Sequence, residues 1–311
     1  MKRRMPLCAG AFAAFLFALF FLPAQTGADN LSGDFLTIEP GAKAAGMGGS
    51  LLAAATGADS LPWNPAALAD LWGSEFSLMH LIWLSGASYE HASFASQITE
   101  DENGFGFSAD YLWMPAFNST FDAQTVPVSA QNMAFTAAYA QKLSEGWGLG
   151  FAGKFLRYKL ADYSSSGAAF DAATRLKLDE EGSIILGASL NNIGTGMKFI
   201  TEKEGFPANA KFGAGYFGEI GEDLGLSVEV DFTNVFGEAF YYGFGGELKL
   251  AGSIFFRAVY KSGWSAASQI SGISGLSGGL GVLLGRWRLD YAVVPYGELG
   301  LTHYVSLTHV S

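Results

Sequence analysis

The chain has 311 residues, of which 50% are hydrophobic and only 15% are charged, and its formal net charge is −11. Such an acidic chain is a poor partner for nucleic acid. Its single cysteine, Cys8, excludes a disulfide framework and a cysteine-ligated metal site. No apolar run after residue 30 reaches the roughly 18 residues that a transmembrane helix needs.

Residues 1–28 are predicted to be a secretory signal peptide. Three basic residues precede an apolar stretch over 7–22, and small residues at 26–28 offer a cleavage site. A membrane anchor is the alternative, because the apolar stretch is long for a signal. Cleavage would remove Cys8 and the three basic residues, which takes the formal net charge from −11 to −14.

The segment 33–71 is rich in glycine and alanine and differs from everything after it. Small residues let two stretches of backbone approach closely, but they order a chain weakly. This segment therefore cannot form a hydrophobic core of its own. We expect residues 29–72 to form a small unit with short helices, here called the hatch, which packs inside a container built from residues 73–311.

From residue 74 onward, apolar and aromatic residues alternate with small, polar or charged ones. In one example, Val228, Val230 and Phe232 alternate with Glu229 and Asp231. Because a closed barrel satisfies every backbone group in lipid, this pattern predicts an all-β transmembrane β-barrel of the bacterial outer membrane. A soluble β-sandwich would show the same alternation, but the number of segments favours the barrel.

About fourteen antiparallel strands are expected, although twelve or sixteen remain open. They lie at about 74–84, 88–98, 104–113, 131–142, 146–158, 168–178, 183–192, 208–218, 224–234, 239–250, 252–262, 277–285, 286–295 and 300–310. Longer connections fall at 114–130, 159–167, 193–207 and 263–276. Bacterial barrels place short turns in the periplasm, so an even count predicts that both termini are periplasmic.

Three stretches carry a resemblance to a known family: the glycine pattern over 40–49, the Trp63-Asn64-Pro65-Ala66 motif, and the last two predicted strands over 278–306. Together they resemble the PorV/PorQ family within the wider FadL-type outer-membrane transporters. The resemblance implies a hatch that plugs a fourteen-stranded, porin-like barrel, which the barrel assembly machinery inserts among outer-membrane lipids. It also implies passive, hatch-gated uptake of hydrophobic compounds, foremost long-chain fatty acids. PorV-like relatives suggest the alternative, a component of a secretion complex that binds or shuttles secreted proteins.

The hatch supplies the predicted gating residues. Proline fixes φ and pushes the residue before it out of the helical region, so the amide of Asn64 is free to tie the hatch to the barrel wall. A plain capping turn at Asn64-Pro65 explains the same residues. The gating candidates are Asn64, Pro65, Ala66, Gly46, Gly48 and Gly49.

Inward-facing cations form the second candidate set. If aromatic positions face lipid, the lumen receives basic residues that can bind the carboxylate of an amphipathic ligand. The alternative is that each cation pairs with an acidic residue of the same face, such as Glu229, Asp231 or Asp290. The ligand-binding candidates are Lys154, Arg175, Lys211, Arg257 and Arg288.

An enzyme is not expected. His91 and Ser93 share one face of a predicted strand, as a base and a nucleophile require. They would face the lumen, however, and no third group is evident. The remaining histidines have no metal-ligand spacing, and no glycine motif between a strand and a helix points to a phosphate. We therefore expect no catalytic residue, no cofactor and no metal.

Overall fold

The computed structural model describes residues 34–311 except 100–101, 122–123, 200–201, 238 and 263–274. The predicted signal peptide and most of the predicted 263–276 connection lie outside these residues. In the described part of the chain, no helix is long and apolar enough to cross a membrane.

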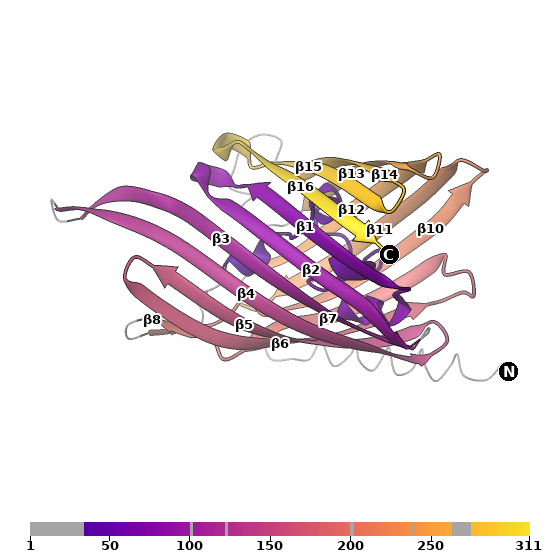
Figure 1. Ribbon diagram of the computed structural model, residues 1–311, viewed down its shortest axis with the longest axis horizontal. Coiled ribbons are helices and arrows are strands. Elements are labelled where there is room, and N and C mark those ends of the chain that lie inside the picture. Colours follow the sequence, from indigo (N-terminus) through magenta and orange to yellow (C-terminus); the bar gives the residue numbers. More distant parts are fainter. Residues whose placement is uncertain (1–33, 100–101, 122–123, 200–201, 238, 263–274) are drawn as a thin grey trace.

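Fourteen antiparallel strands close into a single barrel (Figure 1). The strands are β1 Ser74–Ile82, β2 Ser88–Thr99, β3 Asn103–Phe121, β4 Gln124–Ser144, β5 Trp147–Leu160, β6 Tyr163–Lys177, β7 Ile184–Gly194, β10 Asn209–Ile220, β11 Leu224–Val235, β12 Ala239–Leu250, β13 Ile254–Ser262, β14 Leu276–Leu284, β15 Trp287–Pro295 and β16 Leu301–Val310. Each pairs with its neighbours in chain order, and β16 closes the barrel on β1 with Val310 opposite Glu75. The predicted count of fourteen is confirmed.

The prediction of a loop over 114–130 is wrong. This stretch prolongs β3 and β4, which stay paired out to Phe121 and Gln124 and project beyond the neighbouring strands (Figure 1). Proline cannot donate to a strand ladder. Pro115 lies where the register shifts between Met114 and Phe117, so the bulge removes the need for its missing donor.

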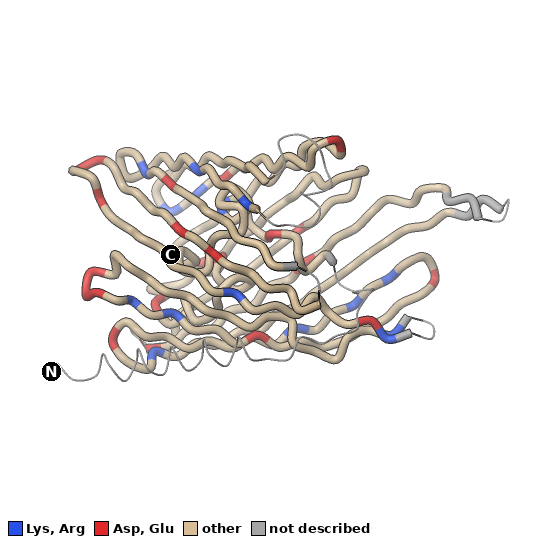
Figure 2. Tube along the Cα trace, turned by 180° about the vertical axis from the view of Figure 1, so that it is seen from behind, with Lys and Arg blue, Asp and Glu red and all other residues tan. Residues whose placement is uncertain are grey.

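Two other connections also differ from the prediction. Residues 161–162 form a short turn between β5 and β6, so the expected loop over 159–167 is mostly strand. The connection between β7 and β10 carries a two-stranded sheet made of β8 Met197–Phe199 and β9 Glu202–Glu204. The first change lengthens the wall at one end of the barrel, whereas β8 and β9 form a sheet separate from the wall. At the other end, where β16 finishes, short turns carry acidic residues (red in Figure 2).

The outer surface of the barrel is apolar. Along β1, for example, Phe76, Leu78 and Ile82 are exposed while Ser77 and Met79 between them are buried. Large exposed hydrophobic residues such as Phe107, Phe155 and Phe244 continue this belt around the wall. A soluble protein rarely exposes so much contiguous apolar surface, and the arrangement is the one that lipid requires of a barrel.

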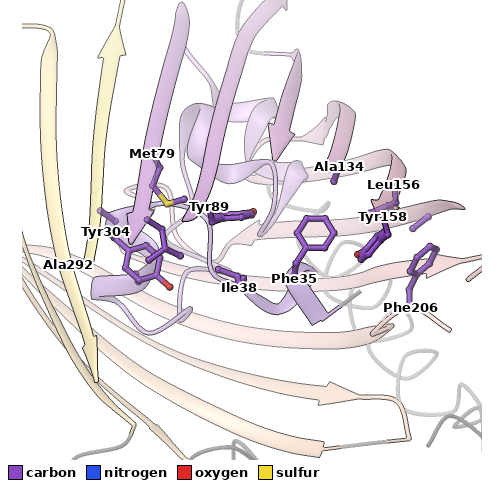
Figure 3. Packing of buried hydrophobic residues seen from close by; sticks show 14 of the residues in the cluster. Phe35, Ile38, Met79, Tyr89, Ala134, Leu156, Tyr158, Phe206, Ala292 and Tyr304 are labelled. Carbon is purple, nitrogen blue, oxygen red and sulfur yellow. The ribbon is translucent and has the colours of Figure 1, made fainter. Parts of the chain in front are cut away.

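The described part of the hatch, residues 34–72, lies inside the barrel (indigo in Figure 1) and contains short helices, namely η1 Asp34–Thr37, α2 Ala42–Gly46, η2 Gly57–Ser60 and η3 Pro65–Asp70. Two more short turns of helix, η4 Leu84–Gly86 and η5 Gly297–Leu299, connect strands. Phe35 and Ile38 of the hatch pack against Tyr89, Tyr158 and Tyr304 of the wall (Figure 3). The hatch therefore takes its core from the barrel, as its composition requires.

Candidate functional site: the hatch and the lumenal cavity

The wall carries glycines where the hatch touches it. A Cβ atom added to Gly150 of β5 would lie 2.3 Å from the backbone nitrogen of Ala66, and one added to Gly104 of β3 would lie 2.3 Å from the carbonyl oxygen of Leu68. Any larger residue would displace η3. These glycines therefore form part of the surface on which the hatch packs.

Two carboxylates of β11 hold one turn of the hatch. Asp231 Oδ2 accepts hydrogen bonds from the backbone nitrogens of Leu51 and Leu52, at 2.9 and 3.0 Å. Glu229 accepts from the next two, with Oε2 2.9 Å from the nitrogen of Ala54. Four successive N–H groups thus converge on two buried carboxyl groups, which fixes an otherwise irregular segment.

From the sequence, these two acids were expected only as ion-pair partners of lumenal cations. Their inward position was readable from the alternation in β11. Their true partners were not, because a backbone N–H group has no sequence signature.

Asn64 acts both as a tie to the wall and as a cap. Its amide nitrogen donates to the carbonyl oxygen of Leu52 in the hatch, at 2.8 Å, and to that of Thr174 in β6, at 3.3 Å. Its Oδ1 accepts from the backbone nitrogen of Ala66 at 3.1 Å, which caps η3 directly before Pro65. One fully buried side chain therefore both ties the hatch to the wall and caps η3, so both interpretations of the motif hold.

The predicted gating residues fall into two separate contacts. Asn64, Pro65 and Ala66 begin η3 and face β5 and β6. Gly46 ends α2 on the other side, where its added Cβ would lie 3.2 Å from the Cα atom of Gly279 in β14.

Gly48 and Gly49 follow α2 with φ of 56° and 74°, a region that glycine adopts without strain. Gly48 packs against Val259 of β13. The glycine pattern of the hatch thus marks a contact with the wall that is distinct from the contact of the Asn64 motif.

The predicted cations all face the interior, and four of them form ion pairs. Lys154 Nζ lies 2.7 Å from Asp171, and Arg175 pairs with Asp70 of the hatch. Arg257 bridges Glu247 and Asp290, and Arg288 joins Asp290 to Asp59 of the hatch. These four cations therefore pair with acidic residues, as the alternative to ligand binding predicted.

Lys211 differs from the other four candidates. It makes no ion pair with any residue that the structure describes, and its Nζ lies 4.6 Å from the centre of the Trp63 ring. A lysine above an indole ring is stabilised by the negative face of the ring and keeps its donors available.

Lys211 and Trp63 border a cavity of about 80 Å³ between the hatch and the wall. Tyr241 and Lys261, near the end of the barrel that carries the longer connections, also line it. A second depression, of about 560 Å³, is lined mainly by outward-facing residues of β1 to β4 and β16, with alanines 92 and 109 among them. Asp110 lines both spaces, so the wall between lumen and exterior is thin at this residue.

The His91 and Ser93 pair is inward-facing and buried. His91 Nδ1 lies 2.7 Å from Asp110 Oδ1, which also accepts a 2.7 Å hydrogen bond from the hydroxyl of Tyr89. The sequence did not reveal Asp110 as a partner, because it lies on the neighbouring strand. Among the described residues, no group of three or more His, Cys, Asp or Glu is placed to hold a metal ion.

A closed fourteen-stranded barrel with an internal N-terminal plug is the fold of the FadL-type outer-membrane barrels, and this chain has that fold. The structure is similar to CymD, a monoaromatic hydrocarbon channel, with a TM-score of 0.61 and 11% identity over 86% of this chain and 96% of that chain. It is equally similar to the toluene transporter TodX of Pseudomonas putida, with a TM-score of 0.61 and 12% identity over 86% of this chain and 97% of that one.

A FadL homologue of Pseudomonas aeruginosa matches with a TM-score of 0.51 and 12% identity over 85% of this chain and 96% of that chain. No protein-family model matches the sequence, and no curated protein does. The FadL-type fold is thus established, whereas membership of the PorV/PorQ family stays a prediction.

Proposed function

We propose that this protein is an outer-membrane channel for the passive, hatch-gated uptake of hydrophobic compounds, with both ends of its barrel domain in the periplasm. The observation that carries the proposal is the hatch itself. It fills the lumen of a barrel with an apolar exterior, yet discrete polar contacts such as those of Asn64, Glu229 and Asp231 hold it in place. These polar contacts can break and re-form, and they act beside the apolar packing that the hatch shares with the wall.

The surroundings of the cavity support a hydrophobic substrate. Its hatch side is formed partly by Leu36, Ile38 and Pro62, which offer apolar surface, and Lys211 is the candidate cation there without an ion pair. Long-chain fatty acids, which the family resemblance implies, would place their carboxylate at Lys211. Solved structures with the same fold are named for toluene and monoaromatic hydrocarbons, which carry no carboxylate. Both kinds of compound belong in the first test.

A second candidate function is the binding or shuttling of a secreted protein, as the PorV-like resemblance suggests. One observation favours it. The paired strands β3 and β4 project well beyond the rest of the barrel, where a protein partner could contact them (Figure 1).

The proposal is tested by uptake of labelled toluene and labelled oleate in cells that lack other carriers for these compounds. Wild type is compared with Asn64→Ala, with a deletion of residues 41–66, and with a shortened β3–β4 hairpin. Barrel assembly is checked in each by heat-modifiable mobility. Uptake that depends on the protein and changes in the two hatch variants supports gated transport. Uptake equal to that of cells lacking the protein, with the barrel assembled, would refute it, and the protein-binding role would take its place.

A further inference from the structure

We propose that the depression on the outer face of β1 to β4 binds a membrane phospholipid whose headgroup carries a primary ammonium and a phosphate, as an ethanolamine phospholipid does. This inference goes beyond the proposed uptake function, because the site lies on the lipid-facing side of the wall. Three features carry it: a pit in the apolar surface, a polar pair at one end of the pit, and the depth of that pair in the membrane.

Two alanines form the floor of the depression. Ala92 of β2 and Ala109 of β3 lie directly opposite each other in the ladder and line the depression. Their neighbours in the same cross-strand row are Leu78 of β1 and Phe135 of β4, which are large and exposed. The exposed Phe94 follows Ala92 on the same face of β2. Large side chains therefore surround two small ones, and this hollows the outer surface.

The depression is a feature of the outer face and not a gap in the wall. The four strands lie side by side (Figure 1), and β1 is paired with β2 along its whole length. β2 is paired with β3 without a register shift from Ser88 to Gln97. The volume of about 560 Å³ is more than three times that of the ~150 Å³ cavity known to hold benzene, so a stretch of acyl chain has room there.

A polar pair lies at one end of the depression. His80 of β1 and Glu90 of β2 are opposite each other, two residues along from the Leu78–Ala92 pair, and His80 Nδ1 is 2.8 Å from Glu90 Oε1. Their side chains are 49% and 44% exposed, and the other nitrogen and the other oxygen bond to no residue that the structure describes. Ionisable groups on the lipid-facing side of a barrel cost free energy, increasingly so with depth. Such a pair therefore favours a polar partner from the membrane.

The pair lies at the depth of lipid headgroups. His80 and Glu90 are each two residues from the end of their strand at the η4 turn. On β3, Tyr111 is opposite Glu90, and the exposed Trp113 follows two residues further along the same face. Tyrosine and tryptophan concentrate at the membrane–water interface. The polar pair is thus next to the interface, and the alanine floor lies deeper, where an acyl chain runs.

An ethanolamine headgroup matches this pair by charge. Its ammonium can donate to Oε2 of Glu90, and its phosphate can accept from Nε2 of a protonated His80. A choline headgroup carries the same positive charge but has no N–H group to donate. A glycerol headgroup has hydroxyl groups but no positive charge to place beside Glu90. Of the three headgroups, only ethanolamine makes both contacts.

The test uses three phospholipids with the same acyl chains, one of which carries a photoactivatable diazirine, and with ethanolamine, choline or glycerol headgroups. Each is added in trace amount to phosphatidylcholine vesicles that contain the full chain. Labelling of β1 to β3 is measured by mass spectrometry relative to labelling of β11 to β13. The ethanolamine lipid is expected to label the depression about fivefold more than the choline lipid, which is the ratio that one hydrogen bond contributes. The glycerol lipid should label it no more than the choline lipid.

Variants then assign the effect to the depression. Glu90→Leu is expected to reduce the preference for ethanolamine over choline to near one. Ala92→Leu fills the floor and should lower labelling by the ethanolamine lipid to the level of the reference strands, and Ala109→Leu repeats this test in case Ala92→Leu fails to assemble. Ala258→Leu is the matched control, because this exposed alanine of β13 does not line the depression.

Equal labelling of the depression by the ethanolamine and choline lipids would overturn the proposed ligand, as would a preference that Glu90→Leu leaves unchanged. If none of the three lipids labels the depression above the reference strands, the site itself is refuted. These results do not depend on uptake, which the hatch and the lumen control in the proposed function.

Discussion

Removing the side chain of Asn64 should release the hatch while leaving the barrel assembled. The side chain makes three hydrogen bonds, to Leu52, Thr174 and Ala66, and it is fully buried. The helix cap contributes about 1 kcal/mol, and each donated bond contributes about 1 kcal/mol. Asn64→Ala should therefore weaken hatch docking by about 3 kcal/mol, which raises the undocked population roughly a hundredfold.

Trypsin measures this population directly, because Lys43 is the one basic residue of segment 34–72. Cleavage at Lys43 should accelerate roughly a hundredfold in Asn64→Ala, if opening precedes cleavage. Asn64→Ser keeps the cap but loses both donated bonds, so an increase of about thirtyfold is expected. Ser277→Ala, which removes one bond to the hatch carbonyl of Ala45, should give about fivefold. Less than a threefold change in Asn64→Ala, with heat-modifiable mobility intact, would refute this account of the motif.

Three further predictions concern the wall glycines that contact the hatch, the ion pairs and the effect of pH. Gly150→Val should expose Lys43 to trypsin as Asn64→Ala does, because the added Cβ would meet η3. Gly153→Val on the same strand is the control, because an added Cβ there meets nothing within 4 Å, and it should leave Lys43 protected. Arg288→Met leaves Asp59 unpaired and should lower the free energy of unfolding in urea by about 3–5 kcal/mol; equal stability of variant and wild type would contradict this. Burial lowers the pKa of Lys43 below its ordinary 10.5, so the hatch takes up a proton when it undocks. Docking should therefore strengthen as the pH rises toward 10.5. Protection of the hatch against chymotrypsin should increase with pH in wild type, and this dependence should be absent in Lys43→Met.

The barrel could be predicted from the sequence because its signal is repeated. The alternation in 224–234 recurs in other strands, such as those over 104–113 and 239–250, and each repeat adds support for the same architecture. Errors arose where the local signal was ambiguous. The stretch 114–130 was predicted to be a connection, but β3 and β4 stay paired through it, with a bulge between Met114 and Phe117 that accommodates Pro115. The inward direction of the cations also followed from the alternation, and the structure places them as expected.

The contacts of the hatch could be predicted only in part. The Asn64-Pro65 pair is a local signal, and it correctly marked a residue that ties the hatch to the wall. The acceptors for the hatch backbone, Glu229 and Asp231, lie about 180 residues away in the chain. Such pairings depend on how the hatch is threaded through the lumen, which the sequence of either partner does not specify.

The central claim, that movement of the hatch opens the path, is tested most directly by locking the hatch to the wall. The backbone nitrogen of Ala42 in the hatch donates to the hydroxyl oxygen of Ser306 in β16 at 2.8 Å, so Ala42→Cys with Ser306→Cys places two thiols on the two sides of an existing contact. Cys8, within the predicted signal peptide, is the only native cysteine, so the mature chain should offer no competing thiol.

Uptake of labelled toluene and labelled oleate is measured in oxidised and reduced cells, with each single cysteine variant as a control. The account predicts that oxidation abolishes uptake in the double variant alone and that a reductant restores it. Equal uptake in both states, with the disulfide confirmed by mass spectrometry, would contradict gating by this contact of the hatch.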